Sequence, residues 1–212
     1  MDGVLIDSEK LWVPAEIKFT QKLIPNFPAA EQKKFCGMSL PDSFKFLQKN
    51  FGLKISAEKF FAEKNKFAID EIYKKTKLMP GVKNFLKKIS AAKIPAAIAS
   101  SSPHEWISTA IDRLKIREFF AEIISADDVA GRGKPAPDIF LLAAKKLKIA
   151  PQNCLIFEDS EHGISAARAA KIPVFAFKNG FNNSQNLSAA DEIFSDFSKI
   201  SEKIFEKFDV KI

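Results

Sequence analysis

The chain has 212 residues, of which 46% are hydrophobic and 28% charged, a balance typical of a globular protein with a substantial core. Lysine and arginine outnumber aspartate and glutamate by 33 to 26, which gives a net charge of +7. No apolar run approaches the ~20 residues that span a bilayer, and the start lacks the basic and apolar regions of a secretory signal, so we expect a cytoplasmic protein without a membrane partner.

The excess of positive charge does not predict binding to nucleic acid. Nearly all of it is lysine spread over expected helix surfaces, as in Lys87-Lys88 and Lys145-Lys146, whereas arginine occurs at only four positions. Proteins that read bases favour arginine, and the sequence has no finger or recognition-motif pattern. We therefore expect no nucleic-acid partner, since that alternative would require a clustered basic face.

The first nine residues, MDGVLIDSE, place acids and a glycine around a short apolar run. Such a pattern is unusual for a chain end and typical of an active-site rim, where a tight turn brings the backbone close to a ligand. The next segment, 9–77, has a helical pattern throughout: Leu11, Ala15 and Phe19 recur at every fourth position, and no strand pattern interrupts it. We expect a helical domain there.

From residue 78 onward, short continuous apolar runs alternate with helical stretches. The expected strands are 96–99, 123–124, 155–157, 174–177 and 193–194, and the expected helices are roughly 82–93, 104–115, 137–148 and 161–171. Continuous apolar strands between helices indicate a parallel sheet covered on both faces. We predict an α/β protein with a doubly wound, Rossmann-like core formed by 1–8 and 78–212, into which the helical domain 9–77 is inserted. The asparagine-rich segment 179–186 is predicted as a surface loop.

Polar residues follow two of these strands. In a sheet of this kind, ligands bind beyond the carboxyl ends of the strands. Ser100-Ser101-Ser102 follows the first run, Glu158-Asp159 follows the third, and Lys134 lies between them. A hydroxyl, backbone amides, a lysine and paired carboxylates together suit a phosphate and a hard cation. Each feature alone also has a structural explanation, as a helix cap, a solvated loop lysine or a pair of acids at a helix start.

Four segments, DGVLIDSE, IASSS, GKPAPDIF and LIFEDSEHGISAARAA, resemble in order and spacing the four motifs of the haloacid dehalogenase superfamily, in its phosphatase and β-phosphoglucomutase-like branch with a small helical cap. The resemblance implies that Ser100, with Gly3 and Ser101 beside it, binds phosphate and that Lys134 stabilises the phosphorylated intermediate. It further implies that Asp2, Glu158 and Asp159 hold Mg²⁺, and that 9–77 is the cap that closes over the site and selects the substrate.

The first motif departs from the family pattern. In the family it is DxDG, where the first Asp attacks phosphorus and the second is the general acid and base. Here Met1 occupies the x position and Asp2 is the second Asp, so the nucleophile would precede Met1 at the end of the family's first strand. We expect that strand and nucleophile to be missing from this chain, and the natural protein to begin roughly ten residues earlier. If the start is genuine, the alternative is a catalytically inactive phosphate-binding protein.

The resemblance implies a Mg²⁺-dependent phosphomonoester hydrolase that acts, as a monomer, on a small sugar-phosphate-like metabolite through an aspartyl-phosphate intermediate. Related mutases carry a His at the position of Trp12 and an Arg at the position of Leu40, and both are apolar here. Hydrolysis is therefore favoured, with a β-phosphoglucomutase-like phosphomutase as the alternative. Cap residues set the substrate, but the four large apolar residues considered for that role fit a hydrophobic core better: Trp12, Phe35, Met38 and Phe44.

Overall fold

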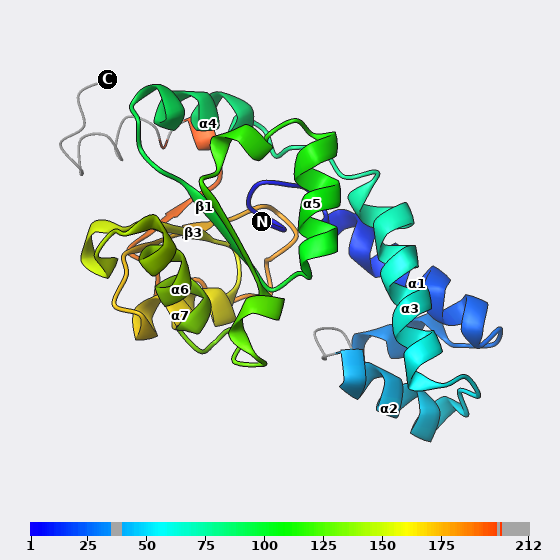
Figure 1. Cartoon of the computed structure of the whole chain (residues 1–212). Coiled ribbons are helices and arrows are strands. Elements are labelled where there is room, and N and C mark those ends of the chain that lie inside the picture. Colours follow the sequence, from blue (N-terminus) through cyan, green and yellow to red (C-terminus); the bar gives the residue numbers. More distant parts are fainter. Residues whose placement is uncertain (35–39, 199, 201–212) are drawn as a thin grey trace. The chain divides into compact units, whose positions relative to one another are not determined.

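The computed structural model describes residues 1–34, 40–198 and 200 (Figure 1). The chain divides into two compact units, one that contains Met1–Asp7 together with the chain from Lys77 onward, and one that contains Ser8–Thr76. The first is an α/β unit and the second a helical unit, and each is described by itself.

The α/β unit alternates strands and helices along the chain. Its elements are α4 (Val82–Ala91), β1 (Ala97–Ser100), α5 (His104–Arg113), η3 (Arg117–Phe119), β2 (Glu122–Ser125), η4 (Ala126–Val129), α6 (Asp138–Leu147), η5 (Pro151–Asn153), β3 (Ile156–Glu158), α7 (Glu161–Ala169), β4 (Val174–Phe177) and β5 (Glu192–Phe194). The expected strands and helices are all present, with ends that differ by at most two residues. The predicted α/β class is confirmed.

The strands form two parallel sheets rather than one. β1 pairs with β2, so that Ser100 lies opposite Ser125, and β4 pairs with β3 on one side and with β5 on the other. Helices cover both faces, as β4 shows. Phe175 and Phe177 of this strand belong to an apolar cluster with α4 and α5, whereas Val174 and Ala176 belong to a second cluster with α6 and α7. The three-layer arrangement explains why β4 is apolar at every position.

An apolar cavity of about 450 Å³ separates the two sheets. Residues 96–99 of the β1 segment and 155–157 of the β3 segment line it, as do Phe85 of α4 and Phe140 of α6. The cavity is thus bounded by strands on two sides and by helices from both outer layers, which places it in the middle layer. Met1 also lines it, and Figure 1 shows the amino-terminal end of the chain beside β1 and β3.

The first residues form a compact turn tied to residues 77–79. The amides of Leu5 and Ile6 donate to the carbonyl of Met1, at 2.8 and 3.3 Å. The amide of Asp7 donates to the carbonyl of Lys77 at 2.9 Å, and the Asp7 carboxylate accepts from the Lys77 amide at 2.6 Å. The two ends of the inserted segment are thereby fixed together within the α/β unit.

The helical unit packs around phenylalanines. Its elements are α1 (Glu9–Leu23), η1 (Ala29–Lys34), α2 (Leu40–Phe51), α3 (Ala57–Ala68) and the π-helical turn η2 (Ile69–Tyr73). Phe19, Phe44 and Phe60 are buried in its core. Phe44 therefore has the core position expected for it, and Trp12 is half-buried against Tyr73, with ring centres 6.2 Å apart. Phe35 and Met38 lie outside the described residues.

A buried ion pair lies in the same core. Lys64 is 4% exposed and pairs with the carboxylate of Glu16. Its ammonium lies 4.8 Å from the ring centre of Phe19 and 5.6 Å from that of Trp12. Burial lowers the pKa of Lys64, and the Glu16 carboxylate opposes this shift. The charge of Lys64 is thus tolerated in the core because Glu16 balances it.

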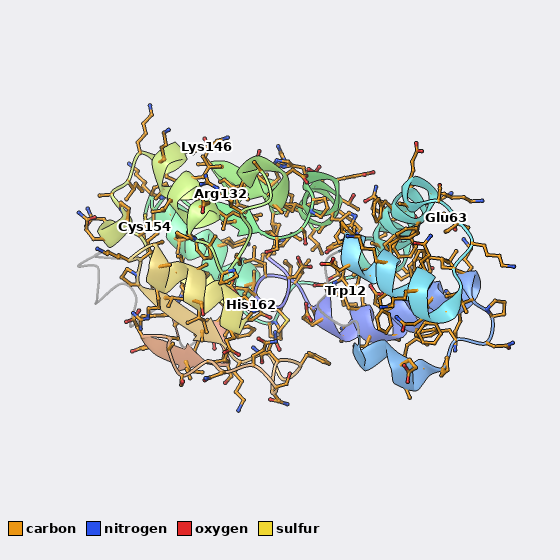
Figure 2. All side chains as sticks on the ribbon, turned by 90° about the horizontal axis from the view of Figure 1, so that it is seen from below. Trp12, Glu63, Arg132, Lys146, Cys154 and His162 are labelled. Carbon is orange, nitrogen blue, oxygen red and sulfur yellow. The ribbon has the colours of Figure 1, made fainter. Side chains whose placement is uncertain are left out.

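We expect Glu16→Gln to lower the free energy of unfolding by about 2 kcal/mol, because it leaves the Lys64 ammonium buried without a counter-charge. Glu63, which is labelled in Figure 2, is the matched control, since it pairs at 3.2 Å with the exposed Lys22 in the same unit. Glu63→Gln should change the free energy by less than about 0.5 kcal/mol. Chemical denaturation of the full chain measures both, and equal losses would show that the Lys64 pair has no special role in stability.

Candidate active site

The predicted site residues lie in the α/β unit, and Lys134 joins two groups of them. Ser100 is the last residue of β1 and Glu158 the last of β3. The Lys134 ammonium donates to the carbonyl of Ala99 at 3.3 Å and forms an ion pair with the Glu158 carboxylate. The carboxyl ends of two strands that do not pair with each other therefore meet at one lysine.

Neighbouring groups hold the Glu158 carboxylate in place. One of its oxygens accepts hydrogen bonds from the Asp159 amide at 2.9 Å, the Ser160 amide at 3.1 Å and the Ser160 hydroxyl at 3.0 Å. Gly163 in the first turn of α7 lies directly against this group, because a Cβ atom there would be 2.0 Å from the carboxyl carbon. Any larger residue at this position would displace the carboxylate.

Glu158 and Lys134 form a charged pair in a buried setting. Their side chains are 7% and 9% exposed. Burial on its own would raise the pKa of Glu158, but the Lys134 ammonium outweighs it and lowers the pKa to about 2. The ammonium also lies 4.8 Å from the ring centre of Phe140. A fixed positive charge is therefore present at the sheet edge.

Asp2 faces the serine-rich loop after β1. The Ser102 hydroxyl donates to the Asp2 carboxylate at 2.8 Å, and the Ser102 amide donates to the Ser100 hydroxyl at 3.2 Å. The Ser125 hydroxyl donates to the Ser102 carbonyl at 2.9 Å, which ties this loop to the end of β2. Ser100 and Ser102 are buried and Ser101 is exposed. The predicted site named Ser100 and Ser101 and missed Ser102, because a run of three serines does not show which of them points inward.

Gly3, Asp159 and Asn179 meet at the other side of the turn. Gly3 has a φ of +63°, and a Cβ atom on it would lie 1.8 Å from an Asp159 carboxylate oxygen. The Asn179 side-chain amide donates to that oxygen at 2.9 Å and to the Gly3 carbonyl at 3.0 Å. The prediction of a surface loop is correct for 183–186 and wrong for Asn182, which is 7% exposed. Ser100 and Glu158 were predicted as site residues because ligands bind at the carboxyl ends of parallel strands. The same rule identifies Asn179, which follows the end of β4.

The amino group of Met1 lies inside this arrangement. Burial lowers its pKa, and the charges that act on it are those of Asp2, Lys134, Glu158 and Asp159. These four are residues that the sequence predicted to act in phosphate or metal binding.

The three predicted metal ligands lie at one sheet edge, but each carboxylate has its own partner: Ser102 for Asp2, Lys134 for Glu158 and Asn179 for Asp159. Within the part of the chain that the structure describes, no three or more His, Cys, Asp or Glu side chains are grouped closely enough to hold a metal ion. The donor atoms offered are all oxygens, the type that Mg²⁺ prefers.

One structural finding concerns membranes: among residues 1–34, 40–198 and 200, no helix combines the length and apolar character needed to cross a bilayer.

Comparisons with known proteins agree with the motifs. Haloacid dehalogenase-like hydrolases match residues 1–177. The "Probable pseudouridine-5'-phosphatase" of Drosophila melanogaster is 28% identical over 97% of this chain and 90% of its own length. The "Phosphorylated carbohydrates phosphatase" of Thermotoga maritima is 27% identical over 91% and 89%, respectively. A crystal structure of β-phosphoglucomutase from Clostridium difficile is 27% identical, with a TM-score of 0.76 over 98% of this chain and 94% of that one. This chain belongs to the haloacid dehalogenase-like hydrolases, in the branch of the phosphatases and phosphoglucomutases.

Proposed function

We propose that this protein hydrolyses the phosphomonoester of a small phosphorylated metabolite through an aspartyl-phosphate intermediate. The observation that carries the proposal is the buried Lys134 ammonium, held by Ala99 and Glu158 where β1 and β3 end. A phosphate is the ligand that best suits a fixed ammonium beside serine hydroxyls and loop amides. The similarity to named phosphatases supports the same reaction.

In the proposed complex, Ser100 and Lys134 bind the phosphate oxygens, helped by the backbone of Gly3 and Ser101. The Lys134 charge stabilises the transition state more than the bound substrate, because the phosphoryl group then interacts with both the attacking and the leaving oxygen. Because Glu158 and Phe140 hold the ammonium in place, no side-chain rearrangement is needed when the substrate arrives.

The attacking carboxylate is proposed to come from a segment joined to Met1. This segment would fill the apolar cavity of about 450 Å³ as a strand parallel to β1 and β3. The side chains at the carboxyl end of this segment would then lie near Asp2 and Lys134, whose charges act on the Met1 amino group. The support for this proposal is the volume and apolar lining of the cavity, together with Met1 among its lining residues.

Two steps complete the reaction. In the first, a carboxylate oxygen of that segment attacks phosphorus, the ester P–O bond breaks, and Asp2 gives a proton to the leaving alkoxide. In the second, a water molecule gives a proton to Asp2 and attacks phosphorus, which releases inorganic phosphate and the free carboxylate. The Ser102 hydroxyl, 2.8 Å from the Asp2 carboxylate, orients Asp2 for both transfers.

Mg²⁺ is the proposed cofactor, held by the carboxylates of Glu158 and Asp159 and the backbone carbonyl of Asp2. When bound, it would offset the negative charge of the phosphate. The residues fit such an ion because they offer only oxygen donors, and because the absence of a side chain on Gly3 lets Asp159 lie against the amino-terminal turn.

Hydrolysis is preferred over phosphoryl transfer within a sugar phosphate. Trp12 packs with Tyr73, and Leu40 begins α2, so these two positions offer an aromatic ring and an aliphatic side chain rather than a charged group for a second phosphate. A phosphomutase remains the second candidate, supported by the similarity to β-phosphoglucomutase. We further propose that the helical unit acts as the substrate-selecting cap and that the protein works as a cytoplasmic monomer.

The first test joins a strand to Met1. The 212-residue chain should hydrolyse p-nitrophenyl phosphate at close to the uncatalysed rate, because loss of an attacking group costs about 10⁶-fold in turnover. A version extended by about five apolar β-branched residues and a final Phe-Asp should gain Mg²⁺-dependent hydrolysis. With a sugar phosphate as substrate, release of inorganic phosphate indicates a phosphatase, and an isomerised sugar phosphate indicates a mutase.

Two matched extensions separate folding from chemistry. The extension that ends in Asn should slow amide exchange at 97–99 and 156–158 as much as the Asp version, without producing activity. An extension with two prolines in the strand should do neither, because proline cannot donate to a strand ladder. Full activity of the unextended chain, or equal activity of the Asp and Asn versions, would overturn the proposed nucleophile.

A second test concerns Lys134 in the extended protein. Lys134→Ala should lower turnover by about 10²-fold or more, because it removes the fixed charge that stabilises the transferred phosphoryl group. Lys145→Ala is the control, since Lys145 is exposed on α6 within the same sequence neighbourhood. It should leave turnover within about twofold of the parent. Equal losses in the two variants would remove Lys134 from the site.

A further inference from the structure

Asn182 joins two loops that follow different strands. Its side-chain amide donates to the carbonyl of Phe177, the last residue of β4, at 2.9 Å, and to the carbonyl of Asp159 at 2.8 Å. Its side-chain oxygen accepts from the Asn179 amide at 3.2 Å. Both amide hydrogens and the carbonyl oxygen of this buried side chain are therefore used. Asn182 fixes the backbone of Asp159 relative to the end of β4.

Asn179 extends the same connection to the side chain of Asp159. Its side-chain oxygen accepts from the amides of Phe181 at 2.8 Å and Asn182 at 3.0 Å. With the oxygen held by two backbone donors, the side-chain nitrogen must point the other way. That nitrogen donates to the Asp159 carboxylate at 2.9 Å and to the Gly3 carbonyl at 3.0 Å. One amide group thus contacts three segments of the chain.

There is no spare room where these segments meet. A Cβ atom on Gly3 would lie 1.8 Å from the Asp159 carboxylate oxygen and 2.7 Å from the Asn179 side-chain nitrogen. The amino-terminal turn, the loop after β3 and the loop after β4 are therefore in direct contact. A shift of the Asn179 amide would displace both of its acceptors.

We propose that Asn179 and Asn182, here called the asparagine clamp, are positioning residues that set the place of the Asp159 carboxylate against the Gly3 turn. The inference rests on the proposed function, in which Asp159 is a ligand of Mg²⁺. An amide suits this task because it donates hydrogen bonds without a charge. The neutral Asn179 amide therefore orients the Asp159 carboxylate without adding a positive charge that would repel a cation.

The variant Asn179→Ser tests the clamp. A serine oxygen can still accept from the loop amides, as in an ST-turn, but it is too short to reach Asp159 and Gly3. Calorimetric titration of the full chain with MgCl₂ should show affinity weakened by about 10-fold, the usual effect of removing a group that orients a metal ligand. In an Asp159→Ala background, the same change should alter the affinity by less than twofold, because Asn179 acts through Asp159.

Asn183→Ala is the matched control, because Asn183 lies in the same loop and its side chain donates only within that loop, to the Gly180 carbonyl at 3.1 Å. It should leave the affinity unchanged. If Asn179→Ser and Asn183→Ala weaken Mg²⁺ binding equally, or if Asn179→Ser weakens it equally with and without Asp159, the clamp has no positioning role.

A second measurement separates the clamp from the proposed metal site. Amide exchange of Leu5 and Ile6, which report on the amino-terminal turn, should become faster in Asn179→Ser and stay unchanged in Asn183→Ala. If the parent chain binds no Mg²⁺ but this exchange difference is found, the proposed metal site is wrong and the positioning role of the asparagine clamp is supported. If neither the affinity nor the exchange responds to Asn179→Ser, the clamp fails. Asn179→Thr, which also keeps an oxygen acceptor for the loop amides, provides the same readouts should the serine variant not fold.

Discussion

The ion pair between Lys134 and Glu158 is the interaction on which the rest of the α/β unit depends. β1 and β3 do not pair with each other, yet their carboxyl ends meet at the Lys134 ammonium. A charge buried to this degree is tolerated only with a partner and hydrogen bonds on the remaining sites. Glu158 meets this requirement through its three additional donors, and Gly163 leaves the space for it. The same group of residues therefore links the carboxyl ends of β1 and β3 and places a fixed charge in the site.

A second constraint follows from placing three carboxylates at one sheet edge. Like charges in a partly buried place repel and raise one another's pKa. The structure separates them by giving each a different neighbour: a cation for Glu158, a hydroxyl for Asp2 and an amide for Asp159. Of these three neighbours, only the Lys134 ammonium carries a charge of its own. Three similar side chains at one sheet edge are thus fixed by three chemically different partners.

Local sequence pattern was sufficient for most of the fold but not for strand pairing. A strand such as β4 is apolar throughout because helices cover both of its faces, and a run of this kind is visible in the sequence. Nothing in a run shows which strand will be its neighbour, so the division into two sheets was not predictable. The site shows the same limit. Ser100, Lys134 and Glu158 follow from motif and position, whereas Ser102 and Asn182 depend on contacts between loops far apart in sequence, and an asparagine-rich stretch reads as a loop from its composition alone.

The cavity connects folding with chemistry. The inner edges of β1 and β3 line it, and each of these strands pairs with one neighbour among the described residues. Open strand edges attract a further strand, and an apolar lining favours one made of branched apolar residues. A strand that paired with both edges would join the two sheets, and its carboxyl end would arrive where the Met1 amino group lies among Asp2, Lys134 and Glu158. Under the proposed mechanism, the strand that completes the sheet would also carry the attacking carboxylate, so activity would require a closed core.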